Sequence, residues 1–104
     1  MALPADALDA LGDGNRRALL ELLRSGDRSV RELADALPIS RPAVSRHLRV
    51  LKQAGLVTDR PEGTRRIYRL DDSGAEAVRR YLEDVWPEAA ARFKLLAENT
   101  PERG

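Results

Sequence analysis

Apolar residues recur at helical spacing in two segments near the start of the chain. The first segment, residues 4–11, ends at Gly12, a residue type that often stops a helix. The second segment begins after Asp13, whose short acidic side chain is suited to capping a helix, and it ends at Ser25-Gly26. The pattern predicts two short amphipathic helices in this part of the chain.

Two further helices are predicted over residues 29–36 and 40–54. The first begins with a capping box, in which Ser29 and Glu32 have the required spacing. The second has Ser40 as its cap and carries an apolar stripe along one side. Because so few residues separate these helices, the chain must turn sharply between them.

The pattern changes after the fourth helix to short runs that are rich in β-branched and aromatic residues. Residues 56–60 and 65–70 are two such runs, and the segment between them contains Pro61 and Gly63. Runs of this composition on either side of a turn are typical of a β-hairpin. We therefore expect a hairpin directly after the fourth helix.

A long final helix is predicted over residues 72–98, with a wide stripe of apolar side chains at helical spacing. One small domain cannot cover so wide a stripe, so the stripe predicts the interface of a homodimer. Pro87 lies inside this helix. Since proline removes a backbone hydrogen bond and clashes with the preceding turn, we expect a kink near Val85 and Trp86.

Charge is unevenly distributed along the 104 residues, although the formal net charge is only +1. Residues 1–40 carry a net charge of −2, residues 41–70 carry +6 and residues 71–104 carry −3. Every charged side chain from Arg41 to Lys52 is basic. A basic centre between acidic flanks indicates a surface that binds a polyanion such as DNA.

Composition narrows the possible classes of protein further. The chain has no cysteine and one histidine, which excludes disulfides, thiolate metal sites and histidine-rich metal sites, and no cofactor is expected. No apolar run approaches the about 20 residues that a membrane span needs, and the N-terminal segment carries acidic residues where a signal peptide has basic ones. We expect one domain, residues 1–104, located in the cytoplasm without membrane contact.

The order of the elements predicts a mainly α-helical fold with a small β-hairpin: four helices, two strands and a final helix. Residues 29–54 then form a helix-turn-helix and residues 56–70 form a wing. In this arrangement the second helix enters the major groove of DNA with its N-terminus first. Its apolar stripe must face the protein, so its other side can read DNA. The candidate DNA-binding residues of this helix and its cap are Ser40, Arg41, Pro42, Ser45, Arg46 and Arg49.

Three segments, Ser40–Leu48, Leu51–Val57 and Gly63–Leu70, resemble the ArsR family of bacterial winged-helix repressors, and the similarity extends over most of the chain. The resemblance implies a homodimer, built through the first and last helices, that binds an inverted-repeat operator in double-stranded DNA. The residues expected at the dimer interface are Leu8, Leu11, Val78, Leu82, Val85, Trp86, Phe93 and Leu96.

The sequence departs from the metal-sensing members of this family. Those members carry a Glu-Leu-Cys-x-Cys motif in the third helix, whereas this chain has Ala34 and Ala36 in place of the cysteines. Other members bind metals through Asp and His pairs on the last helix, where this chain has no histidine. We therefore expect a repressor that does not respond to metals. Either an apolar ligand near Tyr81, Trp86 and Phe93 or, as the favoured explanation, autorepression governed by protein concentration would then control DNA release.

Several residues have a structural explanation beside a functional one. His47 lies next to the apolar stripe, and a lone imidazole completes neither a metal site nor a catalytic pair, so packing or a phosphate contact is expected. Tyr68 and the aromatic residues of the last helix are expected to pack. Arg65 and Arg66 follow the hairpin tip within the basic centre, which favours contacts with phosphates or the minor groove over ordinary exposure.

A DNA-binding repressor is the function that these features favour. A winged-helix module for protein–protein assembly is the alternative, because a fold alone does not determine function, but the charge of the central segment argues against it. An enzyme is the weakest hypothesis, since the sequence offers no nucleophile with its base, no paired acids and no phosphate-binding loop.

Overall fold

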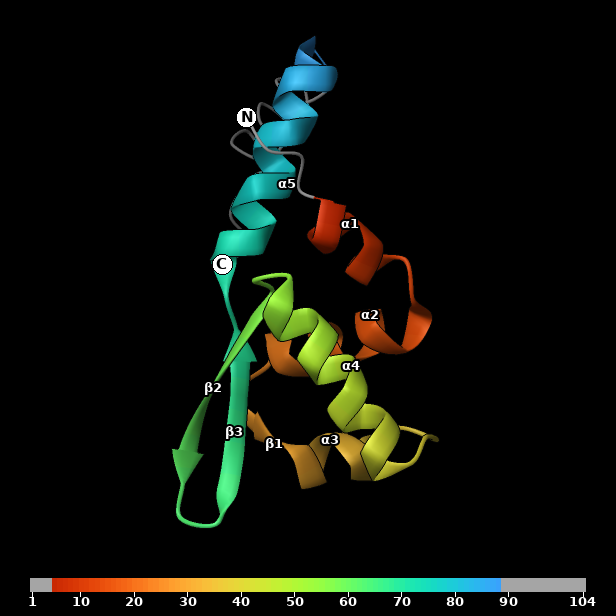
Figure 1. Ribbon diagram of the computed structural model, residues 1–104, viewed down its shortest axis with the longest axis vertical. Helices are drawn as coiled ribbons and strands as arrows, with labels where there is room; N and C mark the ends of the chain where they lie inside the picture. Colours follow the sequence, from red (N-terminus) through yellow and green to blue (C-terminus); the bar gives the residue numbers. More distant parts are fainter. Residues whose placement is uncertain (1–4, 89–104) are drawn as a thin grey trace, which may run out of the picture.

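The computed structural model describes residues 5–88 and has the predicted winged helix-turn-helix architecture (Figure 1). Its elements, in chain order, are α1 (Ala5–Leu11), α2 (Gly14–Arg24), β1 (Arg28–Ser29), α3 (Val30–Ala36), α4 (Arg41–Gln53), β2 (Val57–Glu62), β3 (Arg65–Leu70) and α5 (Asp72–Val85). None of the helices in this part of the chain is long and apolar enough to cross a membrane.

The predicted caps of the helices are present and explain where the helices begin. The Asp13 carboxylate accepts hydrogen bonds from the backbone N–H groups at the start of α2. Ser29 and Glu32 form the reciprocal capping box of α3, and the Ser40 hydroxyl accepts the Ala43 N–H at 3.2 Å. These bonds satisfy N–H groups that the first turn of a helix leaves without partners.

The core lies where α2, α3 and α4 meet. Leu19 of α2, Leu33 of α3 and Leu48 of α4 are each completely buried. These side chains belong to the apolar stripes of the three helices, so the helices pack on the faces that the sequence pattern indicates.

The wing belongs to a three-stranded antiparallel sheet with the order β1-β3-β2. Strands β2 and β3 pair along their whole length, and Gly63 has the positive φ of +63° that the tight turn between them requires. The sequence did not predict β1, in which Arg28 and Ser29 pair with Tyr68 and Ile67. The strand β3 is therefore held on both edges at its middle residues.

The break at the end of α5 is sharper than the predicted kink. The helix stops at Val85, and Trp86 adopts φ −128° and ψ 65°, outside the helical region. Pro87 explains this break, because it has no N–H and its ring disfavours helical backbone in the residue before it. The helix is therefore interrupted where the kink was predicted, and residues 87 and 88 are helical again. The rest of the predicted helix, including Phe93 and Leu96, lies outside the described residues.

The turn after α4 is fastened to the start of α5. Gly74 donates its N–H to the Gly55 carbonyl at 2.8 Å, and the Ser73 hydroxyl donates to the same carbonyl at 3.1 Å. Asp71 donates its N–H to the Leu56 carbonyl at 3.0 Å. In Figure 1, α5 extends toward one end of the molecule, whereas the hairpin tip and the start of α4 lie toward the other end.

Candidate nucleic-acid interface

Helix α4 has one side in the core and the other in solvent. Val44, Leu48 and Leu51 are completely buried. Because these positions recur at helical spacing, the residues between them project away from the protein. The buried stripe therefore fixes which side of α4 is available to a ligand.

The predicted DNA-binding residues of α4 lie on its solvent side, as the pattern indicated. The side chains of Arg41, Pro42, Arg46 and Arg49 are exposed, and Ser45 is half-buried. Among residues 5–88, the ion pairs include none of these three arginines. Exposed guanidinium groups without acidic partners are well suited to contact phosphates and guanine bases.

The predicted wing residues differ from those of α4, because acidic residues of the wing lie beside them. Arg65 is 3.5 Å from Glu62, and Arg66 Nε is 3.3 Å from Asp59 Oδ2. Both arginine side chains remain more than half exposed, at 56% and 55%. They are accessible to DNA, but their charge is partly balanced within the wing.

Asp59 links the wing to α4, a contact that the sequence did not predict. Its side chain is only 6% exposed, and its second oxygen, Oδ1, is 2.8 Å from Lys52 Nζ in the last turn of α4. A single acidic residue within a basic segment gave no reason to choose Asp59 as a candidate site residue. Strand alternation could have revealed it, because Val57 points inward and Asp59 lies two residues further on the same face.

Tyr68 packs at the base of the wing, as predicted. It lies directly opposite Asp59 in the hairpin and contacts the hydrophobic core. Burial, with a smaller contribution from the Asp59 charge, raises the pKa of Tyr68 above its ordinary value. His47 is half-buried beside the core stripe.

The predicted dimer residues are divided between the surface and the core. Leu8, Leu82, Val85 and Trp86 are 39%, 42%, 45% and 56% exposed, respectively. Leu11 and Val78 are half-buried and pack against the core cluster. The exposed members come from α1 and from α5 with its C-cap, and contacts between these two helices place them in one region of the fold. This end of the molecule is the one that lies away from the start of α4 (Figure 1).

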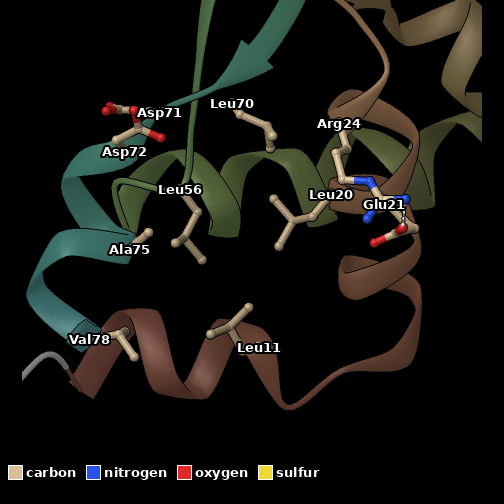
Figure 2. Close-up of a pocket in the computed structure, with 10 residues that line it drawn as sticks. All are labelled: Leu11, Leu20, Glu21, Arg24, Leu56, Leu70, Asp71, Asp72, Ala75 and Val78. Carbon is tan, nitrogen blue, oxygen red and sulfur yellow. Dashed lines mark ion pairs between the residues drawn. The ribbon is translucent and has the colours of Figure 1, made fainter. Parts of the chain in front are cut away.

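A hollow of about 340 Å³ lies between α1, α2 and the start of α5 (Figure 2). Its walls include Leu11, Leu20, Leu56 and Val78, and the ion-paired Glu21 and Arg24 lie at its edge. Tyr81 and Trp86, which the sequence suggested for an apolar ligand, do not line this hollow, and Phe93 lies outside the described residues.

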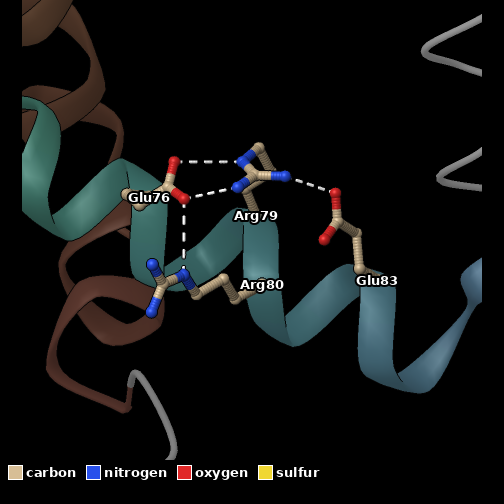
Figure 3. A network of polar contacts seen from close by, with 4 residues as sticks. All are labelled: Glu76, Arg79, Arg80 and Glu83. Carbon is tan, nitrogen blue, oxygen red and sulfur yellow. Dashed lines mark hydrogen bonds and ion pairs between the residues drawn. The ribbon is translucent and has the colours of Figure 1, made fainter.

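Two glutamates of α5 form a network of ion pairs with arginines of the same helix (Figure 3). Glu76 contacts Arg79 and Arg80, and Glu83 contacts Arg79. Hydrogen bonding to Glu76 raises the pKa of Arg79, and the Arg79 guanidinium lowers the pKa of Glu76. Within residues 5–88, no group of three potential ligands is placed to hold a metal ion.

A short turn between α3 and α4, an α4 whose outer face carries arginines, and an adjoining β-hairpin define a winged helix-turn-helix protein of the DNA-binding class. Comparison with known sequences supports this class. Bacterial regulatory proteins of the arsR family match residues 13–59. Over 96 residues the chain is 51% identical to an HTH-type transcriptional regulator of Mycobacterium tuberculosis, covering 92% of this chain and 90% of that protein. Over 98 residues it is 33% identical to the arsenical resistance operon repressor of Escherichia coli, covering 93% and 84%.

Solved structures give the same result. A possible transcriptional regulator for arsenical resistance is 43% identical, with a TM-score of 0.72 and coverage of 92% of this chain and 98% of that one. A homodimeric winged helix-turn-helix DNA-binding domain from Mycobacterium bovis is 33% identical, with a TM-score of 0.63 and coverage of 94% and 81%. The chain therefore belongs to the bacterial ArsR family. It is a DNA-binding transcriptional regulator and not an enzyme.

Proposed function

We propose that this chain is a homodimeric repressor that binds an inverted-repeat operator. The observation that carries the proposal is the outer face of α4, where a serine caps the N-terminus and three exposed arginines form no ion pair with an acid of residues 5–88. A bound dimer blocks access of RNA polymerase to the promoter, so the protein represses by occupying its operator.

Each part of the fold has its own role in this proposal. Residues 29–54 form the helix-turn-helix, residues 56–70 form the wing, and residues 72–98 supply the dimerisation segment of a single domain. We assign base contacts in the major groove to the cap and the first three turns of α4, because side chains there reach base edges when a helix enters N-terminus first. The residues assigned to this role are Ser40, Arg41, Pro42, Ser45, Arg46 and Arg49.

Arg65 and Arg66 of the wing take a different role. They lie beside the hairpin tip and remain accessible. We assign them to the phosphate backbone or the adjoining minor groove, where contacts position a protein and carry little information about sequence.

The dimer is supported by the apolar surface of α1 and α5 and by the homodimeric relative from Mycobacterium bovis. The exposed part of this surface includes Leu82, Val85 and Trp86, which would lose water on pairing. A two-fold dimer places two copies of α4 about 34 Å apart, which matches successive major grooves and requires an inverted-repeat site.

We propose that this repressor does not respond to metals and regulates its own promoter. Ala34 and Ala36 provide no sulfur ligands at the positions of the family's cysteine motif. Carboxylates alone hold zinc poorly, because selective sites add imidazole or thiolate ligands. Repression of its own gene then makes occupancy follow protein concentration, without the need for an inducer.

A gel-shift titration with the chain's own promoter tests the proposal. In the presence of excess random duplex, a repressor retains a specific shifted complex, because specific binding typically exceeds non-specific binding by about 10³-fold or more. If the random duplex abolishes the complex at the same concentration as unlabelled promoter, specific DNA binding is wrong. The alternative, a protein–protein assembly module, would then be favoured.

A further inference from the structure

The carboxylate of Asp59 joins two elements of the proposed DNA-binding surface. Its Oδ1 is 2.8 Å from Lys52 Nζ at the end of α4, and its Oδ2 is 3.3 Å from Arg66 Nε on β3. The Asp59 side chain is 6% exposed, whereas the two basic side chains are 52% and 55% exposed. One buried acid therefore lies between two accessible cations that belong to different elements.

Lys52, Asp59 and Arg66 together form a joint between α4 and the wing. The burial of Asp59 makes this joint sensitive to the loss of any partner. A carboxylate withdrawn from water is stable only when cations or hydrogen bonds compensate for the lost hydration, and here each oxygen has its own cation. Without the Asp59 charge, Lys52 and Arg66 would face one another as like charges. The Asp59 carboxylate thus attracts the wing toward the last turn of α4, where repulsion would otherwise act.

We propose that Asp59 is a positioning residue that determines how strongly this protein prefers its operator to other DNA. The inference rests on the proposed function, because it assumes that α4 and the wing bind DNA together. It does not make Asp59 a DNA contact. Asp59 acts through Lys52 and Arg66, whose exposed ends it orients.

The Asp59 carboxylate has two opposing effects on DNA binding. The joint holds the wing and α4 in one arrangement before binding, so the specific complex loses less conformational freedom when it forms. The Asp59 charge also reduces the positive potential of the surface, which lowers the affinity for any duplex. Positioning benefits the aligned complex alone, whereas the lost attraction affects all DNA. Only the positioning effect increases the ratio of specific to non-specific affinity, because the lost attraction lowers both affinities by similar factors.

The test compares D59N with a matched control, E62Q. Glu62 is an acid of the same hairpin, lies 3.6 Å from Arg60 and 3.5 Å from Arg65, and has a side chain that is 53% exposed. E62Q removes the same charge without separating the wing from α4. Fluorescence anisotropy measures the Kd of each full-length variant for the promoter fragment and for a random duplex of equal length.

We expect D59N to lower the ratio of specific to non-specific affinity by about fivefold or more, while binding to the random duplex stays equal or becomes tighter. E62Q should tighten binding to both duplexes by similar factors. Equal changes for the two duplexes in D59N would overturn the inference, because the Asp59 charge would then act only as a repulsive charge.

A measurement on the free protein separates this inference from the proposed function. Amide hydrogen exchange of the hairpin reports its local opening. We expect faster exchange in β2 and β3 of D59N, and no change in E62Q. Unchanged exchange in D59N would show that Asp59 does not hold the wing, whatever the DNA result. A wild-type protein without operator preference would instead refute the proposed function.

If D59N does not fold by circular dichroism, K52Q breaks the joint from the α4 side and leaves the Asp59–Arg66 pair. Faster exchange in the wing of K52Q would support the joint, and unchanged exchange would refute it. The affinity ratio of K52Q should also fall. A ratio equal to that of the wild type would overturn the role in specificity.

Discussion

Gly74 at the start of α5 lies directly against Gly55 in the turn between α4 and β2. The two backbone segments are so close that no side-chain atom fits between them. The Gly74 N–H donates to the Gly55 carbonyl at 2.8 Å, and a Cβ added at Gly74 would lie 2.6 Å from the Ala54 carbonyl oxygen. Glycine at position 74 is therefore required by this close backbone approach.

Replacing Gly74 with alanine should destabilise the fold. The new methyl group must push backbone away from backbone, which costs about 1–3 kcal/mol and exceeds the gain in helix propensity. G14A is the matched control, because a Cβ there would lie 3.7 Å from the nearest atom of Arg17. It should instead stabilise α2 by about 0.5 kcal/mol. Urea denaturation measures both, and equal stability of the two variants would contradict the tight contact.

Replacing Leu82 with glutamate should convert the dimer to a monomer. The L82E variant places a charge in the apolar surface that the partner is proposed to cover. Light scattering at micromolar concentration should give twice the chain mass for the wild type and the chain mass for L82E. Trp86 is the sole tryptophan, so its emission should shift to longer wavelength in L82E.

The control for this experiment is D84N, which changes an exposed residue of the same helix without adding a charge to the apolar surface. It should remain dimeric. A wild-type protein that stays monomeric at these concentrations would refute both the dimer and the inverted-repeat operator.

The arginines of α4 and of the wing should have different effects on DNA binding. R46A should weaken operator binding by about 1–3 kcal/mol and relax sequence preference, because a bidentate contact with a base is lost. R65A, which changes a wing arginine that is paired with Glu62 and not with Asp59, should weaken binding to all sequences alike and reduce the salt dependence by about one unit of slope. Anisotropy titrations across salt concentrations measure both effects. The opposite result would reverse the roles of the helix and the wing.

The capping box of α3 should contribute to acid sensitivity. The hydrogen bond from the Ser29 backbone N–H is the largest cause that lowers the pKa of Glu32 below its ordinary value. A lowered pKa in the folded state stabilises the fold above the ordinary glutamate range, and this stabilisation is lost as the pH falls through the folded pKa. E32Q should therefore be less stable than the wild type at pH 7, and the difference should shrink in acid.

Urea denaturation at several pH values gives this comparison. E21Q, at an exposed glutamate of α2 that takes part in no cap, is its control. It should preserve the pH dependence of the wild type. A stability difference between E32Q and the wild type that is constant from pH 7 to acid would show that the Glu32 charge does not act through the cap.

Metals should leave the operator complex unchanged. We expect zinc, nickel, copper and arsenite, titrated in a buffer without chelators, to have no effect on operator affinity. The physical reason is the absence of cysteine and the presence of a single histidine in the sequence. A specific, stoichiometric loss of about tenfold, equivalent to about 1.4 kcal/mol of coupling, would show that the protein has a metal site.

Local signals in the sequence predicted the helices well. Asp13, Ser29 and Ser40 each cap the helix that the pattern assigned to them, because a cap depends only on residues that are neighbours in the chain. The arginines of α4 were placed on its outer face by the same kind of evidence, since the apolar stripe fixes the orientation of the helix.

Features that depend on distant residues were not predicted. Strand β1 has two residues, and its pairing with Tyr68 and Ile67 joins parts of the chain that no periodicity connects. The bridge from Asp59 to Lys52 and Arg66 likewise depends on how the wing packs against α4. Pro87 gave the position of the interruption at Trp86, because a proline acts on the residue directly before it in the chain.

The pairing of β3 on both edges determines where the wing can become longer. The middle residues of β3, Ile67 and Tyr68, are paired with both β1 and β2, while the hairpin tip between Glu62 and Arg65 has no such constraint. Extra residues inserted at exposed tips are tolerated far better than insertions within paired strands. Lengthening the chain at Gly63-Thr64 would therefore extend the wing along the DNA backbone while α3 and α4 stay in place. The hairpin tip is thus where evolution or protein engineering can alter the length of the DNA footprint without rebuilding the helix that reads the sequence.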